Sequence, residues 1–325
     1  MKERNCLIDV MRGMGIIFVL LGHRALPNII VKMIYAFHMP LFFFISGYLY
    51  KKCELRKFVI KKIKKLILPY IFFWLISAII GFFASKIGII DNYNVDKLVE
   101  QIVYYTPNGF WNGPLWFLPC LFVVEIMFCF INQYFNKYST LISSFVIPFL
   151  GYLCTRYNIY LIFKIDIAFT GLFFYSLGNC ISNNKKLTGE FHKKYFLLYI
   201  CAFIISVFKF NNLIVQMIVG KYGNYILFIL NAVLGIYLTY QFACILKNNV
   251  IFQTIGRESL IIMSLHFVVF MVIIDPIQNK LYISNLCIKY FVTILDVLLC
   301  LLICHIIYVL KDNRLYKTLK RKETV

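Results

Sequence analysis

The chain has 325 residues, of which 61% are hydrophobic and only 15% are charged. Soluble domains are about half apolar and about a quarter charged, so this composition excludes an ordinary soluble protein and predicts an all-α, polytopic membrane protein. The formal charge of +20 is typical of nucleic-acid-binding proteins. Here the basic residues cluster between apolar runs, which instead predicts contact with the lipid bilayer and no nucleic-acid partner.

About ten apolar runs have the length expected of transmembrane helices. They lie at residues 7–26, 29–50, 66–88, 114–135, 140–155, 163–182, 195–210, 224–246, 259–275 and 286–310. Basic residues concentrate in alternate connections, with eight in 51–65 and six in the charged tail 311–325. Positive charge favours the cytoplasmic side, so we expect both termini in the cytoplasm. The tail is too short for a second domain, and residues 1–325 are expected to form a single membrane domain.

The first expected span contains charged residues, in the sequence "DVMRGMGIIFVLLGHRALP". Arg12 and His23 are eleven residues apart, which on an α-helix is about 1100° of rotation and a rise of about 16 Å. The two side chains are therefore expected on one helix face, with Arg12 towards the cytoplasm and His23 towards the outer surface. Asp9, three residues before Arg12, is on the same face and within pairing distance.

Two interpretations of these residues follow from the spacing. In the first, Arg12 binds phosphate of a donor that enters from the cytoplasm, and His23 acts as a general base. In the second, Arg12 pairs with Asp9, and His23 is a hydrogen-bonded residue at the membrane interface. Ionisable side chains within the membrane are costly, and they commonly face a polar cavity.

The segment "KKCELRKFVIKKIKK" at 51–65 follows the second span. Leu55, Val59 and Ile63 recur every four residues among lysines, which predicts a basic amphipathic helix on the inner leaflet. We favour a topological anchor as its role. Attraction of a polyphosphate donor is the alternative.

Further ionisable residues lie within later spans. His38 is expected near mid-membrane in the second span, and His266 in the ninth. Together with Arg12, Glu125 and Asp166 they predict a polar cavity. In the tenth span, Asp296 and His305 are interpreted as members of structural pairs. The cysteines are scattered without a CxxC motif, so no metal site is expected.

Several motifs resemble the membrane-bound acyltransferase 3 family. They are "LIDVMRGMGIIFVLLGH" with its R-x10-H spacing, "FHMPLFFFISGYL", "LILPYIFF", "GPLWFL", "FFYSLGNCI" and "GRESLIIMSLHF". The likeness spans nearly the whole chain and is most specific in the first fifty residues. It is greatest to the single-domain members related to polysaccharide and fucose O-acetylases, without the extra hydrolase-like domain. This family often has an aromatic residue where Met263 stands.

The resemblance implies a multi-pass protein of the bacterial cytoplasmic membrane that transfers an acyl group, usually acetyl from acetyl-CoA, to a hydroxyl of a cell-surface glycan. O-antigen, capsule, exopolysaccharide and a lipid-linked precursor are the candidate acceptors. It also implies that His23 and His38 are catalytic and that Arg12 takes part in donor binding. Supporting roles are expected for Asp9, Trp116, Glu125, Ser259 and His266.

Some alternatives remain open at this point. A transporter or flippase for a glycan or lipid-linked intermediate also places Arg, His and Asp within a membrane. Transfer by a covalent acyl-histidine and direct transfer are equally compatible with the sequence. The oligomeric state is not predicted.

Overall fold

The computed structural model describes residues 5–90, 102, 111–184, 187, 189–210, 213–281 and 286–323. Across these ranges every regular element is a helix, and extended pairing is limited to one bridge between Gln216 and Lys221. Seven helical stretches in the described ranges are long and apolar enough to cross a membrane. These are Asn28–Tyr48, Leu55–Lys86, Gly113–Tyr134, Ile162–Asn183, Tyr225–Ile245, Val250–Gln278 and Ile288–Leu310. The protein is therefore an all-α, multi-pass membrane protein, as the composition predicts.

The three other expected spans also fall on helices. They are α1 (Cys6–Gly22), α8 (Lys137–Arg156) and the pair α10 (Phe196–Ile205) and η4 (Ser206–Phe210). With 17 residues, α1 is about 25 Å long, less than the ~30 Å hydrocarbon core. The first turns of α8 are rich in serine and threonine. By length and apolar character, the described residues thus contain seven spanning helices where the sequence predicts about ten.

The remaining elements follow in chain order. They are α2 (Asn28–Tyr35), α3 (His38–Tyr48), α4 (Leu55–Lys62), η1 (Ile63–Ile67), α5 (Leu68–Lys86), η2 (Gly113–Trp116), α7 (Phe117–Tyr134), η3 (Ile162–Lys164), α9 (Ile165–Asn184), η5 (Met217–Val219), α11 (Tyr225–Ile245), α12 (Val250–Val268), η6 (Val269–Ile274), α13 (Asp275–Leu281) and α14 (Leu286–Glu323).

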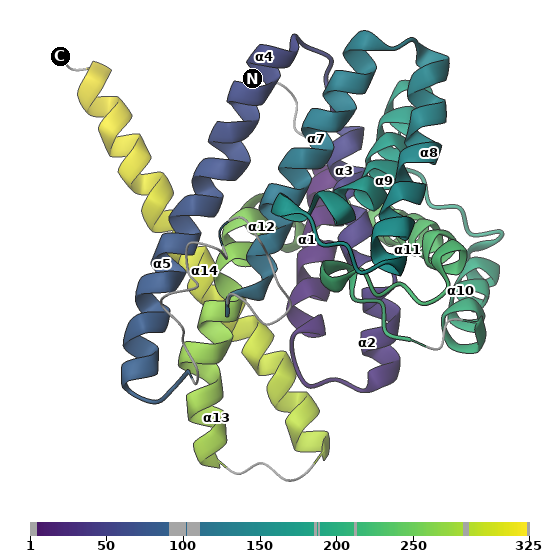
Figure 1. Cartoon of the computed structure of the whole chain (residues 1–325). Helices are drawn as coiled ribbons and strands as arrows, with labels where there is room; N and C mark the ends of the chain where they lie inside the picture. The colour runs from purple at the N-terminus through teal and green to yellow at the C-terminus, as the bar shows by residue number, and fades with distance from the viewer. Residues whose placement is uncertain are drawn as a thin grey trace.

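The central helix of the bundle is α1. It packs against α12, α3 and α11, and α3 in turn packs against α9. In Figure 1, α4 and the C-terminal end of α14 lie towards the upper end of the bundle, whereas α2 and α13 lie towards the lower end. The bundle therefore has two distinct ends, and the basic segment 51–65 belongs to the upper one.

Glycines allow the central helices to approach each other closely. A Cβ on Gly13 of α1 would lie 2.2 Å from the carbonyl oxygen of Phe252, and one on Gly256 of α12 would lie 1.8 Å from that of Asp9. The same arrangement joins α3 to α9 through Gly47 and Gly178. Small residues at helix contacts are typical of membrane proteins, where close packing replaces the hydrophobic effect as the source of helix association.

The sequence predicts that the basic segment 51–65 forms an amphipathic helix on the inner leaflet, but in the structure its helix continues into the next span. Residues Leu55–Lys86 form one continuous helical stretch, in which α4 leads through the π-helical turn η1 into the spanning helix α5. Figure 1 shows α4 and α5 running down one flank of the bundle. Within α4, Phe58 is the buried residue. The helix α14 likewise extends past its apolar part and through most of the charged tail.

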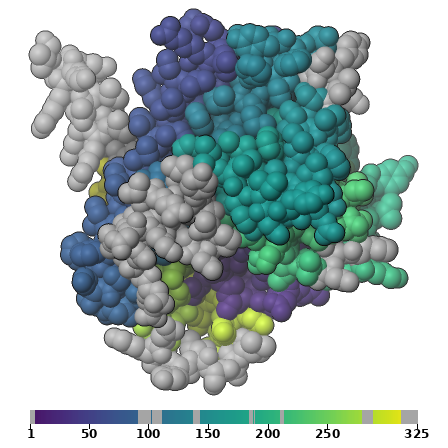
Figure 2. Space-filling model, viewed as in Figure 1, coloured from purple at the N-terminus to yellow at the C-terminus, as the bar shows by residue number. Residues whose placement is uncertain are grey.

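The flank formed by α4 and α5 exposes large apolar side chains. In the space-filling view, α4 and α5 form the left part of the visible face, and the teal segments, which include α7 and α8, cover its centre (Figure 2). Large apolar side chains such as Phe72, Ile79 and Phe83 on α5 are exposed, at 58%, 58% and 64%. This is the pattern expected of a helix that faces lipid.

Candidate active site

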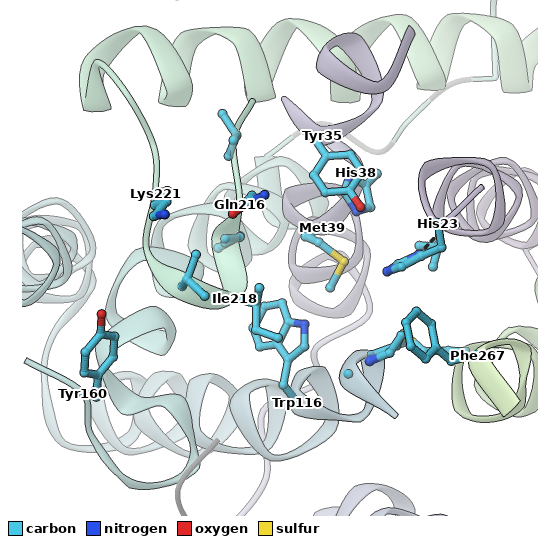
Figure 3. A pocket seen from close by; sticks show the side chains of 17 residues that line it. His23, Tyr35, His38, Met39, Trp116, Tyr160, Gln216, Ile218, Lys221 and Phe267 are labelled. Carbon is cyan, nitrogen blue, oxygen red and sulfur yellow. Dashed lines mark hydrogen bonds between the residues drawn. The ribbon is translucent and has the colours of Figure 1, made fainter. Parts of the chain in front are cut away.

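Two of the cavities in the described part of the bundle hold most of the predicted site residues. The first, which we call the histidine cavity, has a volume of about 500 Å³. It is lined by Val19, His23, Tyr35, His38, Met39, Gly113, Pro114, Trp116, Tyr160, Val215, Gln216, Met217, Ile218, Val219, Lys221, Met263 and Phe267. Figure 3 shows the imidazole of His23 pointing into this cavity, with Phe267 beside it and Trp116 further across the cavity.

Each cavity histidine is held in one tautomer by a backbone carbonyl four residues earlier in the chain. His23 is the residue that ends α1, and its Nδ1 lies 2.7 Å from the carbonyl oxygen of Val19. The Nδ1 atom of His38 lies 2.9 Å from the carbonyl oxygen of Ile34. A carbonyl oxygen only accepts hydrogen bonds, so Nδ1 carries the proton in each ring. In the neutral form, Nε2 of each histidine then carries the lone pair that a general base requires.

Each cavity histidine lies against the ring of another residue, Tyr35 for His38 and His266 for His23. The Tyr35 ring lies 4.9 Å from that of His38, between centroids, and its hydroxyl donates to the carbonyl oxygen of Gly22 at 3.1 Å. The fully buried His266 lies 5.1 Å from His23, again between ring centroids. His266 does not line the cavity, so it contacts the His23 ring from outside the cavity lining.

One wall of the histidine cavity comes from the segment 213–223, which joins η4 to α11. Gln216 and Lys221 exchange backbone hydrogen bonds of 2.8 and 3.1 Å around a tight turn. Gly220 sits in that turn with φ of +69°, a conformation that favours glycine. The turn places the side chains of Gln216, Ile218 and Lys221 opposite the histidines (Figure 3).

The second cavity, which we call the basic cavity, has a volume of about 600 Å³. It is lined by Arg12, Phe42, Ser46, Leu49, Lys61, Lys62, Lys64, Lys65, Leu66, Pro69, Phe117, Leu118, Leu121, Glu125, Gly256, Arg257, Ser259, Leu260 and Met263. Of the described lining residues, six are lysine or arginine and Glu125 is the one carboxylate. The excess of positive charge suits a polyanionic ligand.

Ion pairs organise the wall of the basic cavity. The buried Glu125 accepts from Nζ of Lys62 at 2.5 Å, which ties the basic segment to α7. The buried Asp9 forms an ion pair of 3.6 Å with Arg257 of α12. This ion pair joins α1 to α12, and the side chain of Arg12 lines the same cavity.

The remaining predicted residues divide between the two cavity linings and places outside them. Trp116 lines the histidine cavity and Ser259 the basic cavity. Asp166 lies in neither lining; it accepts a hydrogen bond of 3.2 Å from the backbone of Leu161. His305 pairs with Glu258 at 2.6 Å, as expected of a structural residue.

Arg24, for which the sequence predicts no role, anchors the end of α1 beside His23. Its guanidinium bonds to Asp296 at 2.5 and 3.0 Å, to Asp275 at 2.5 Å and to Gln278 at 2.9 Å. It also lies 4.8 Å from the centroid of the Phe270 ring. The sequence signal for such a contact is Asp296, because a carboxylate within an apolar span requires a compensating partner.

The basic and histidine cavities meet at α12. Met263 lines both, and it is the residue that the two sets of described lining residues share. The basic cavity therefore lies on one side of Met263, and the cavity with the two imidazoles lies on the other. Such an arrangement can bring a group carried by an anionic molecule towards a general base.

The comparisons with known proteins give one match. A family model described as an acyltransferase domain, Acyl_transf_3, matches residues 7–308, which is nearly the whole chain. Neither the curated proteins nor the solved structures contained a match. The matched range includes both cavities and every predicted site residue.

Proposed function

The chain belongs to the acyltransferase 3 family, and we propose that it transfers an acetyl group from acetyl-CoA to a hydroxyl of a cell-surface glycan. The family match supports acyl transfer in general. The observation that carries the finer proposal is the meeting of the basic cavity and the histidine cavity at Met263. One cavity suits the phosphates of a donor, and the other suits a hydroxyl that must lose a proton.

On the donor side, the basic cavity matches the chemistry of coenzyme A. Its phosphates are polyanionic, and arginine and lysine side chains bind phosphate through charge-assisted hydrogen bonds. Arg12, Lys64 and Lys65 are the groups we propose for this contact, since all three line the cavity. The rise of about 16 Å between Arg12 and His23 along α1 suits an elongated donor whose phosphates and thioester are far apart.

On the acceptor side, His23 is the proposed general base. Its Nε2 takes the proton of the acceptor hydroxyl as the hydroxyl oxygen attacks the thioester carbonyl. A C–O bond forms, the C–S bond breaks, and the proton passes from His23 to the departing thiolate of coenzyme A. His23 lies at the C-terminal end of α1, where the helix dipole stabilises positive charge on the ring during transfer.

His38 is the second proposed catalytic residue. Its ring lines the same cavity and is held by Ile34 and by the adjacent Tyr35 ring. From this place Nε2 of His38 accepts a hydrogen bond from a hydroxyl of the acceptor and orients that hydroxyl towards the thioester. The segment 213–223 and Tyr160, on the opposite wall, are proposed to contact the sugar.

The proposed setting is the bacterial cytoplasmic membrane, with the basic cavity open to the cytoplasm and the histidine cavity towards the outer surface. This orientation follows from the basic segment 51–65 at the same end as the basic cavity. The acceptor is then a glycan or a lipid-linked precursor at the outer face. A transporter is not favoured, because the family match is to an acyltransferase domain.

Mass spectrometry of the surface glycan tests the proposal. Cells that express the wild-type chain are expected to gain one acetyl group per modified sugar relative to cells without the gene. The variant His23→Ala is expected to abolish that gain at an unchanged protein level in the membrane. Equal acetylation in wild-type and His23→Ala cells would exclude His23 as the base, and an unchanged glycan mass in both would contradict glycan acetylation.

A further inference from the structure

The two cavities follow one another along a single face of α12. Ser259 lines the basic cavity, Phe267 lines the histidine cavity, and Met263, midway between them, lines both. Residues spaced by four lie one above another on a helix. The face formed by these three residues therefore passes directly from one cavity to the other, and Met263 lies at the boundary.

The same boundary crosses the facing elements. On α3, Met39 lines the histidine cavity and Phe42 the basic cavity, less than one turn later. At the start of α7 the change occurs between neighbours, because Trp116 lines the histidine cavity and Phe117 the basic cavity. The partition between the cavities is therefore thin. Rigid aromatic rings of α3 and α7 bound it on one side, and Met263 closes it from α12.

Methionine is suited to a partition that must open. Its unbranched side chain has three rotatable bonds and packs adaptably against aromatic rings. Met263 is 5% exposed, and its carbonyl oxygen accepts a hydrogen bond of 2.9 Å from Nδ1 of His266. His266 in turn lies against His23, at 5.1 Å between ring centroids. The backbone at the partition is thus held next to the proposed base.

We infer that Met263 determines which acyl group is transferred. This inference rests on the proposed function, in which the acyl group is the leading end of a donor held in the basic cavity. That group must pass Met263 to reach His23. A two-carbon group passes with a small displacement of the thioether, whereas a longer chain must occupy the volume of the methionine side chain, and the aromatic rings opposite cannot yield as readily.

The test compares acetyl-, propionyl-, butyryl- and hexanoyl-CoA as donors for the purified full-length protein. For Met263→Ala we expect the kcat/KM for butyryl-CoA relative to acetyl-CoA to rise about tenfold, the scale on which pockets discriminate added methylenes. Met263→Phe is expected to retain acetyl transfer, because the family often has an aromatic residue at this position, and to lower the kcat/KM for propionyl-CoA about tenfold while the Kd for coenzyme A is unchanged. Met271→Ala serves as the matched control, because Met271 lies further along the same helical stretch and lines neither cavity.

Two outcomes separate this inference from the proposed function. If wild type transfers acetyl but Met263→Ala and Met263→Phe keep the wild-type donor preference and rate, Met263 does not select the acyl group and the proposed function stands. If wild type uses none of the acyl-CoA donors, the proposed function itself fails, and the inference fails with it. Should Met263→Ala not fold, Met263→Phe and the volume-conserving Met263→Leu, which is expected to retain the wild-type preference, still decide the question.

Discussion

The imidazole of His266 lies directly beside that of His23, with ring centroids 5.1 Å apart, although the two residues come from helices near opposite ends of the sequence. The Nδ1 atom of His266 donates to the carbonyl oxygens of Ile262 and Met263 at 3.0 and 2.9 Å. Its Nε2 therefore carries a lone pair, and this buried atom has no hydrogen-bond partner within the described part of the chain. An unused acceptor so close to His23 is expected to stabilise His23 when it becomes protonated.

The variant His266→Phe tests this role, since it keeps an aromatic ring and removes the lone pair. We expect kcat to fall by about tenfold to a hundredfold, a part of the contribution of general base catalysis, with the KM for acetyl-CoA unchanged. Steady-state kinetics of the purified protein measure both constants. A wild-type kcat in His266→Phe would assign His266 to packing alone.

Arg12 is expected to contribute to donor binding. Arg12→Ala should raise the KM for acetyl-CoA by about tenfold to a hundredfold, since hydrogen bonds to charged groups contribute about 1.5–3 kcal/mol. The same variant should weaken discrimination between acetyl-CoA and acetyl-pantetheine, which lacks the nucleotide phosphates. The exposed Arg56, which lines neither cavity, supplies the matched control Arg56→Ala. An unchanged KM in Arg12→Ala would leave Arg12 a structural residue.

Arg24 is expected to position His23 without touching the donor. Arg24→Ala removes the bonds to Asp296, Asp275 and Gln278 that anchor the end of α1. We expect kcat to fall about tenfold, because small displacements of a catalytic group are costly, while the KM for acetyl-CoA is retained. Asp275→Asn removes a single, 39% exposed partner and is expected to have a smaller effect. A change in KM without a change in kcat would contradict a positioning role.

The contact between α1 and α12 predicts a stability effect. Gly256→Ala introduces a Cβ that would lie 1.8 Å from the carbonyl oxygen of Asp9, so the two helices must separate. Overpacking of this kind costs about 1–3 kcal/mol, and we expect a lower thermal midpoint in detergent. Gly113→Ala is the control, because its Cβ would meet nothing within 4 Å. Equal midpoints for the two variants would show that the bundle adapts at α1.

Much of the fold was predictable because it depends on local composition. Several apolar runs marked the helices within a few residues, as with 224–246 against Tyr225–Ile245, but the run 259–275 missed the first nine residues of Val250–Gln278. The sequence did not reveal that α4 joins α5 in one helix, since lysine-rich and apolar segments differ in composition but continue the same backbone. It also did not separate the spanning helices from the shorter α1 and the more polar α8. For α1 the reason is that the apolar run 7–26 continues past Gly22, where the helix ends.

The candidate site was predictable in part, because Arg12 and His23 come from the same helix. The spacing of Arg12 and His23 placed them on one face of α1, and the structure brings each to its own cavity. The pairing of Asp9 with Arg257 was missed because it joins residues far apart in sequence. The turn containing Gln216 and Lys221 was not predicted either, since nothing in the sequence between the runs 195–210 and 224–246 indicates that this segment folds over a cavity.

The most direct test of the account is the sidedness of acetyl transfer. In inverted membrane vesicles, which expose the cytoplasmic face, labelled acetyl-CoA is added outside and the glycan acceptor is enclosed within. The account predicts label on the enclosed glycan with the wild-type protein and none with His23→Ala, because the donor binds in the basic cavity and the acceptor in the histidine cavity. Label that appears only on glycan supplied outside, or that is equal with His23→Ala, would contradict it.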